Sequence, residues 1–191
     1  MTARSEWNAL EIVQGMVASR VKPGDFCIDA TAGNGGDTAF LCGLVGPEGK
    51  VLAFDIQEQA IAATRKLAEE QGFADRVETV LASHSEMDRY ADPESASCIL
   101  FNFGWLPGGD HNVITRTETS IPAIQKSLTI LRPGGLLSLC IYYGRNNGFG
   151  ERDAILDYLS GIDCRAYTVI RYDFLNRPNN PPFPIFVFKE D

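Results

Sequence analysis

The sequence predicts an α/β fold, in which helices flank a seven-stranded and mostly parallel β-sheet within a single domain, residues 1–191. Short apolar segments alternate with helical patterns along most of the chain, an order typical of parallel sheets. A turn containing Gly33, Gly35 and Gly36 joins the first apolar segment to the helix that follows. The last two apolar segments, 167–174 and 183–188, have no helix between them and therefore predict a closing antiparallel hairpin.

In the first half of the chain, hydrophobic periodicity defines each element. Leu10, Val13 and Val17 recur at helical spacing and predict a helix over residues 8–19. Glycine and proline then separate the strands from the helices, because both residues interrupt regular structure. The elements predicted here are strands at 26–30, 50–55 and 76–82, and helices at 37–45 and 57–71, with Asp37 expected to cap the first of these helices.

The second half of the chain continues the alternation. Ser83 and its small hydroxyl neighbours favour a helix start after the third strand. Ile121, Ile124 and Leu128 mark one face of a later helix, and the segment Arg132-Pro-Gly-Gly135 predicts a turn after it. The elements predicted here are strands at 95–103 and 136–143, helices at 116–131 and 151–160, and the two strands of the hairpin.

Composition limits the classes of function. With 45% hydrophobic and 22% charged residues, the chain is typical of globular proteins, and its net charge of −8 argues against broad electrostatic capture of nucleic acid, so any RNA contact must be local. Five cysteines, an odd number without zinc spacing, predict a reduced cytoplasmic protein with no metal site. No apolar run approaches the roughly 18 residues needed to span a bilayer, so we expect no membrane segment.

The glycine turn favours a cationic cofactor without phosphate groups. A dinucleotide fingerprint starting at Gly33 would require glycine where Thr38 stands, which disfavours an NAD-dependent oxidoreductase. The carboxylates of Asp29 and Asp37 bracket the turn and would repel a pyrophosphate. S-adenosylmethionine is a cation, and Asp55, 22 positions after Gly33 at the end of the second strand, is placed to accept both of its ribose hydroxyls.

The residues expected to bind this cofactor lie in the glycine turn and after the second and third strands, because ligands bind at the carboxyl ends of parallel strands. After the third strand, Ser83 or His84 is placed to hydrogen-bond the adenine ring. The full set is Asp29, Thr31, Gly33, Asn34, Gly35, Asp37, Thr38, Asp55, Ile56, Gln57, Ser83 and His84.

The loop after the fourth strand carries the candidate catalytic residues. Asn102 and Trp105 have the spacing of the Asn/Asp-Pro-Pro-Tyr/Phe loop of amino-group methyltransferases, with Phe103-Gly104 as the middle pair. We expect Asn102 to accept from the target amine and Trp105 to stack on the substrate base. Asp110 or His111 is a further candidate to orient the amine or take its proton.

These segments resemble the MnmM (YtqB-like) family of tRNA methyltransferases, formerly labelled rRNA methylases. The residues that carry the resemblance are Asp29-Ala-Thr-Ala-Gly-Asn-Gly-Gly-Asp-Thr38, Phe54-Asp-Ile-Gln57, Asn102-Phe-Gly-Trp-Leu-Pro-Gly-Gly-Asp-His111 and Asn176-Arg-Pro-Asn-Asn-Pro-Pro182. The resemblance implies a Rossmann-like class I methyltransferase fold. It also implies methylation of 5-aminomethyl-2-thiouridine at the wobble position of tRNA, and a homodimer.

For such a substrate we expect an anticodon stem-loop to contact Arg145, Arg177, Asn179 and Asn180, which lie in polar, Gly/Asn/Pro-rich loops without a role in the core. Three alternatives remain at this point: a methyltransferase acting on rRNA, on a small molecule or on a protein. A non-catalytic S-adenosylmethionine-binding module is disfavoured because Asn102 and its aromatic neighbours follow the fourth strand.

Overall fold

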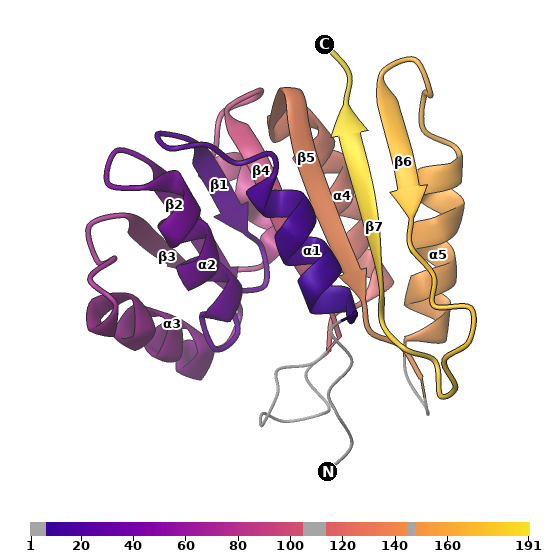
Figure 1. The fold of residues 1–191 in the computed structure, drawn as a ribbon, viewed down its shortest axis with the longest axis horizontal. Coiled ribbons are helices and arrows are strands. Elements are labelled where there is room, and N and C mark those ends of the chain that lie inside the picture. Colours follow the sequence, from indigo (N-terminus) through magenta and orange to yellow (C-terminus); the bar gives the residue numbers. More distant parts are fainter. Residues whose placement is uncertain (1–6, 105–113, 145–147) are drawn as a thin grey trace.

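The computed structural model describes residues 7–104, 114–144 and 148–191, and its seven strands form one sheet in the order β3-β2-β1-β4-β5-β7-β6 (Figure 1). Pairing is parallel from β3 to β5, and β7 is antiparallel to both β5 and β6. The predicted seven-stranded, mostly parallel sheet with an antiparallel ending is therefore confirmed. The strands are β1 (Phe26–Asp29), β2 (Lys50–Asp55), β3 (Val77–Leu81), β4 (Ala96–Phe103), β5 (Leu131–Ile141), β6 (Tyr167–Arg171) and β7 (Phe183–Lys189).

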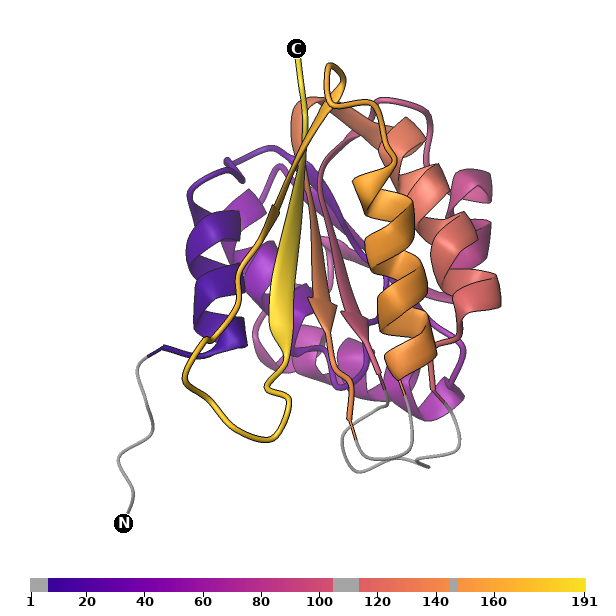
Figure 2. The ribbon, with the colours of Figure 1, turned by 90° about the vertical axis from the view of Figure 1, so that its right-hand side faces the viewer.

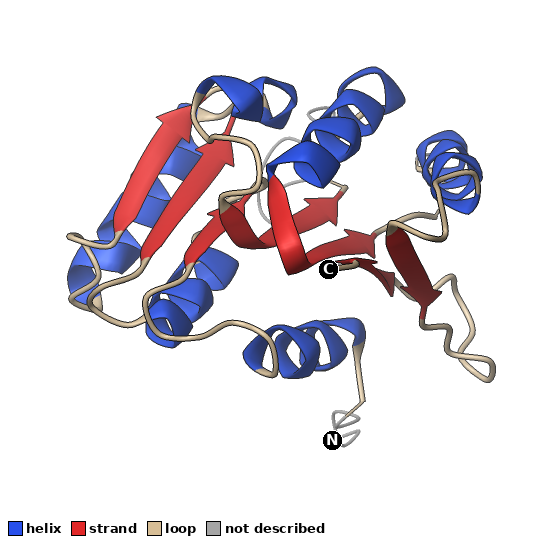
Figure 3. Ribbon diagram, turned by 90° about the horizontal axis from the view of Figure 1, so that it is seen from above, coloured by secondary structure: helices blue, strands red, loops and turns tan. Residues whose placement is uncertain are grey.

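Helices cover both faces of the sheet (Figures 2 and 3). Their bounds are α1 (Ala9–Ala18), α2 (Gly36–Val45), α3 (Glu58–Glu70), the 3₁₀ helix η1 (His84–Arg89), α4 (Thr117–Ile130) and α5 (Phe149–Ser160). Alternate strand residues point to opposite faces, so the core divides in two. One half packs under η1, α4 and α5 and includes Phe54, Phe101 and Phe103, and the other packs under α1 and α2 and includes Leu100 and Phe186.

Side-chain caps explain two of the helix starts. The side chain of Asn8 accepts from the Glu11 N–H at the start of α1, and Ser83 accepts from the Ser85 N–H before η1. The prediction that Asp37 caps α2 is wrong, since the N-cap is Gly35, which has φ +84° and makes no side-chain hydrogen bond. Asp37 lies in the first turn of α2 instead, where a carboxylate is favoured by the helix dipole.

The segment 132–135 is also not the predicted turn. It belongs to β5, which starts at Leu131, and the register shifts there: Leu131 pairs with Ala96, whereas Leu136 pairs with Cys98. The irregularity accommodates Pro133, which has no N–H to donate to a ladder, and Gly134, whose φ of +71° lies outside the β region. Within the described part of the chain, no helix combines the length and the apolar character that a membrane crossing demands.

Candidate cofactor and substrate site

A cavity of about 790 Å³ opens at the carboxyl ends of the parallel strands. The strand ends and loops that form it are far apart in sequence and meet there because parallel strands all end at one edge of the sheet. Of the residues predicted to act in catalysis or cofactor binding, those lining the cavity are Thr31, Gly33, Asn34, Asp37, Asp55, Ile56, Gln57, Ser83, His84 and Asn102.

Three predicted cofactor residues do not line this cavity. Asp29 is fully buried behind the turn, where its carboxylate accepts from Thr38 Oγ1 at 2.6 Å and from the Thr31 N–H at 3.2 Å. Thr38 is buried with it. Gly35 lies against α3, since a Cβ at this position would come 2.9 Å from Thr64 Cα. These residues shape the turn from behind rather than facing a ligand.

Asp55 connects the glycine turn to the end of β2. One carboxylate oxygen accepts from the Gly33 N–H at 3.0 Å, and the other accepts from the Gln57 N–H at 2.9 Å. A carboxylate has about four acceptor sites, so both oxygens can still accept from a ligand. Asp55 therefore holds the turn in place and offers a fixed carboxylate at the cavity wall.

Two neighbouring carboxylates make the turn electrostatically unusual. Burial raises the pKa of Asp29 to about 7, and repulsion from Asp37 adds to the shift. Burial also raises the pKa of Asp37, although the hydrogen bond from Asn102 opposes this shift. A pair of carboxylates that cannot both ionise easily favours a positively charged ligand, which would offset their repulsion.

The raised pKa of Asp29 predicts a stability change with pH. Folded Asp29 keeps its proton up to about pH 7, whereas the unfolded chain releases it near pH 4. The folded state thus binds more protons between these values, and the free energy of unfolding falls as pH rises through this window. We expect this carboxyl to contribute a fall of roughly 1–3 kcal/mol, measured by urea unfolding at pH 5 and pH 8.

The variant Asp29→Asn isolates this effect. Its amide oxygen can accept from the Thr31 N–H while its nitrogen donates to Thr38 Oγ1, so both hydrogen bonds survive without a titrating group. Contributions from other titrating groups, such as His84, largely cancel in the comparison. An equal pH slope in wild type and variant would contradict the assignment.

His84 forms a neutral wall of the cavity. Its ring hydrogen-bonds the backbone of Ala30 and lies edge-on to Phe101 and Phe103, with ring centroids 5.6 and 6.3 Å away. Burial lowers the pKa of His84 to about 4, so the imidazole is uncharged near neutral pH. Its Nε2 is buried and has no hydrogen-bond partner among the described residues.

Asn102 links β4 to the glycine turn through two hydrogen bonds. Its backbone N–H donates to Thr31 Oγ1 at 2.8 Å, and its side-chain Nδ2 donates to Asp37 Oδ2 at 2.6 Å. Phe101 and Phe103 point into the core on one face of the strand, so alternation directs Asn102 to the other face. The candidate amine acceptor is thus fixed directly against the candidate cofactor turn.

The cavity also contains residues that the sequence analysis did not assign to the site. Tyr142 follows β5, the parallel neighbour of β4, and Thr119 stands in the first turn of α4. Burial raises the pKa of Tyr142, so its phenol stays protonated. The rule that places ligands at the carboxyl ends of parallel strands also applies to β5 and could have identified Tyr142.

Glu151 holds in place the residue that follows β4. Its carboxylate accepts from Thr115 Oγ1 at 2.9 Å and from Ser120 Oγ at 2.6 Å, and Thr115 Oγ1 in turn accepts from the Gly104 N–H. The Thr115 N–H also donates to the Gly104 carbonyl. Gly104 and Thr115 are therefore held together and to α5, next to Asn102.

The predicted substrate residues lie outside the cavity or outside the described residues. Arg177 stacks over the Phe174 ring at 3.9 Å and donates to the Trp7 carbonyl, next to α1, whose Leu10 lines the cavity. Asn179 and Asn180 have φ values of +65° and +50°, and Asn180 lies close to Gly144. The remaining predicted residues, Trp105, Asp110, His111 and Arg145, fall outside the described ranges.

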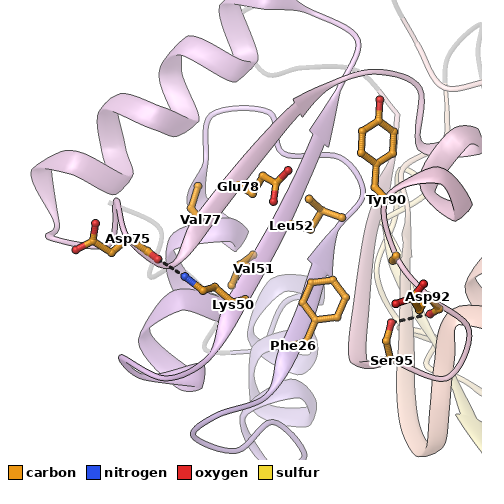
Figure 4. A pocket seen from close by; sticks show the side chains of 11 residues that line it. Phe26, Lys50, Val51, Leu52, Asp75, Val77, Glu78, Tyr90, Asp92 and Ser95 are labelled. Carbon is orange, nitrogen blue, oxygen red and sulfur yellow. Dashed lines mark hydrogen bonds between the residues drawn. The ribbon is translucent and has the colours of Figure 1, made fainter.

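A second cavity, of about 640 Å³, lies at the amino ends of β1, β2 and β3 (Figure 4). Phe26, Leu52 and Tyr90 form its apolar part, and Lys50 donates to the Asp75 carbonyl at its edge. It is remote in the sheet from the strand ends that carry the predicted site. Among the described residues, no group of three or more His, Cys, Asp or Glu side chains could hold a metal ion.

Comparison with known proteins decides the family. Residues 51–188 match the model of the family described as "Putative rRNA methylase". The chain belongs to this family. A tRNA (mnm(5)s(2)U34)-methyltransferase of Arabidopsis thaliana chloroplasts is 34% identical over 96% of this chain and 70% of its own length.

Two solved structures of similar proteins have the same fold as this chain over nearly its full length. A protein from Clostridium thermocellum described as an rRNA methylase is 42% identical, covers 96% of this chain and 98% of its own, and superposes with a TM-score of 0.93. A protein from Streptococcus mutans described as "a putative methyltransferase", solved in complex with SAH, is 36% identical over 96% of this chain and 98% of its own, with a TM-score of 0.87. This chain therefore has the fold of class I methyltransferases.

Proposed function

We propose that this chain is an S-adenosylmethionine-dependent tRNA methyltransferase. In this proposal it converts 5-aminomethyl-2-thiouridine to 5-methylaminomethyl-2-thiouridine at wobble position 34. The observation that carries the proposal is the 34% identity, across 96% of the chain, to a relative named for this modification. The geometry of the cavity supports it independently.

The cavity fits the cofactor. S-adenosylmethionine, when bound, supplies an electrophilic methyl group on a positively charged sulfur. Asp37 and Asp55 line the cavity and suit a cation that has no phosphate groups. Asp55, held by Gly33 and Gln57, is the residue proposed to bind the ribose hydroxyls, and His84 and Ser83 lie on the wall proposed for adenine.

Asn102 and Tyr142 are the described residues proposed to position the substrate. An amine reacts only with a free lone pair, so its N–H groups need acceptors, and Asn102 supplies one at the cavity wall. Tyr142 presents an aromatic side chain to the same cavity. With S-adenosylmethionine in the cavity, Asn102 and Tyr142 would hold the amine with its lone pair free to face the methyl group that the cofactor would supply.

We assign the RNA contacts to the rim of the cavity. Arg116 lines the cavity, and Arg177 lies beside α1. The two arginines supply local positive charge on a protein whose net charge is negative. Asn179, Asn180 and Arg145 are proposed to contribute polar contacts from the neighbouring loops.

Five free cysteines, four of them buried, suit a protein of the reducing cytoplasm.

A direct assay tests the function. Undermodified tRNA is incubated with the purified protein and S-adenosylmethionine, and its nucleosides are analysed by mass spectrometry. We expect 5-aminomethyl-2-thiouridine to gain one methyl group. Methylation of rRNA, of a small molecule or of protein in parallel incubations, with tRNA unchanged, would replace this substrate by the corresponding alternative.

We also propose a homodimer formed through the outer edge of β6. The Tyr172 N–H donates to the Pro184 carbonyl, and the Glu190 N–H donates to the Ala166 carbonyl. The backbone N–H and C=O groups of the even-numbered residues along β6 therefore point toward β7. The backbone groups of Val169 therefore point outward, where no described strand pairs with them. Antiparallel pairing of Val169 with its own copy sets Arg165, which pairs with Asp163 in its own chain, opposite Asp173 of the second copy, which pairs with Arg171.

Proline at position 169 tests this interface. Val169→Pro removes an outward N–H and leaves the β6–β7 hydrogen bonds intact. We expect wild type and the control Val169→Ala to sediment as dimers and Val169→Pro to sediment as a folded monomer. A dimeric Val169→Pro variant, or a monomeric wild type, would exclude this edge.

A further inference from the structure

The side chain of Asn102 is oriented by a residue from the cofactor turn. Its Nδ2 lies 2.6 Å from Asp37 Oδ2, although the two residues are 65 positions apart in the sequence. A second contact, from the Asn102 N–H to Thr31 Oγ1 at 2.8 Å, fixes the backbone at the same point. The position of Asn102 is thus set by Thr31 in the turn after β1, and the direction of its amide by Asp37 in the first turn of α2.

The chemistry of the pair decides which end of the amide is left for a ligand. Asp37 Oδ2 accepts from the NH₂ end of Asn102 at 2.6 Å, and an amide that donates through its nitrogen still has its carbonyl oxygen as an acceptor. No described residue donates to that oxygen, and both Asp37 and Asn102 line the 790 Å³ cavity. The carbonyl oxygen is therefore the end of the amide available to a bound substrate.

The orientation matters because the two ends of the amide have opposite effects on an amine. A carbonyl oxygen accepts an N–H and leaves the nitrogen lone pair free to attack. An NH₂ group turned toward the substrate would instead donate to that lone pair and withdraw it from the reaction. Without a fixed partner, the amide of Asn102 can adopt either orientation.

We propose that Asp37 is a positioning residue, which holds the Asn102 amide with its oxygen directed at the methyl-accepting amine. The inference rests on the proposed amine substrate and adds to it a role for Asp37 that is separate from attraction of the cofactor. Because Asp37 belongs to the first turn of α2, the same turn that lines the cofactor site aligns the acceptor of the substrate.

Reversal of the pair tests the proposal. In Asp37→Asn the partner no longer selects the NH₂ end of Asn102, and in Asn102→Asp two carboxylates face each other at about the 2.6 Å of the present contact. In the double variant, the new amide at position 37 donates to the new carboxylate at position 102, whose second oxygen still accepts from the amine. We expect each single variant to lose about 30-fold or more in kcat at saturating cofactor, and the double variant to recover to within about fivefold of wild type.

Cofactor binding and folding are measured alongside. SAH affinity by calorimetry and thermal unfolding are determined for all four proteins, so that kcat is compared only between folded, saturated enzymes. If Asp37 acted only by attracting the cofactor, Asp37→Asn would change affinity and retain kcat at saturation. That result, or a double variant no more active than the singles, would overturn the positioning role.

A spectroscopic measurement separates this inference from the proposed substrate. The side-chain ¹⁵NH₂ resonance of Asn102 is recorded without RNA, and we expect slow exchange with water in wild type and faster exchange in Asp37→Asn. If the Asn102 NH₂ exchanges slowly in the wild type but the protein fails to methylate tRNA, the proposed substrate is refuted while the proposed orientation of the amide stands. Equal, fast exchange in both proteins would refute the orientation, whatever the substrate.

Discussion

Replacing Gly35 with alanine is expected to destabilise the protein by about 2–4 kcal/mol and to abolish most cofactor binding. Gly35 has φ +84°, a conformation that costs an L-residue roughly 1–2 kcal/mol. Its Cβ would also lie 2.9 Å from Thr64 Cα, and backbone cannot move aside as a flexible side chain can. Both effects act at the N-cap of α2, between Gly33 and Asp37 of the cavity wall.

The adjacent glycine supplies the control. Gly36 has no positive φ, and a Cβ there would meet nothing within 4 Å, so Gly36→Ala should fold with nearly unchanged stability. The two variants are compared by urea unfolding and by calorimetric titration with SAH. Equal stability of the two variants would mean that the approach of α3 to the turn is not a constraint on residue 35.

Predicting the fold from sequence worked where local pattern and tertiary packing agree. The β2 and β3 strands, Lys50–Asp55 and Val77–Leu81, begin directly after Gly49 and Arg76, a glycine and a charged residue that mark their starts. The start of β5 was missed because Pro133 and Gly134 signal a turn in isolation. Pairing of Leu131 with Ala96 nevertheless extends the strand through an irregular register, and only the neighbouring β4 reveals this.

The cavity residues were predictable to the extent that they follow directly after a strand. Thr31, Asp55 and Ser83 come from the general rule for parallel sheets. Contacts between remote segments were not predictable in this way. The assignment of Asp37 as a helix cap used local sequence alone, whereas its observed partner is Asn102 on β4. Thr119 likewise reaches the cavity because of where α4 begins in space.

Replacing Asp55 with alanine is expected to weaken binding of S-adenosylmethionine by tenfold or more. A hydrogen bond to a charged group is worth about 1.5–3 kcal/mol, and Asp55 is proposed to make two of them to the ribose. The variant also removes the acceptors of the Gly33 and Gln57 N–H groups, so the turn itself loses its connection to β2.

Glu58→Ala is the matched control, because Glu58 is an exposed carboxylate three residues further along that does not line the cavity. Affinities are measured by calorimetry on variants shown to be folded by thermal unfolding. If Asp55→Ala and Glu58→Ala bound the cofactor equally well, the role of Asp55 would be limited to stabilising the turn through the Gly33 and Gln57 N–H groups. Another residue of the cavity wall would then have to bind the ribose.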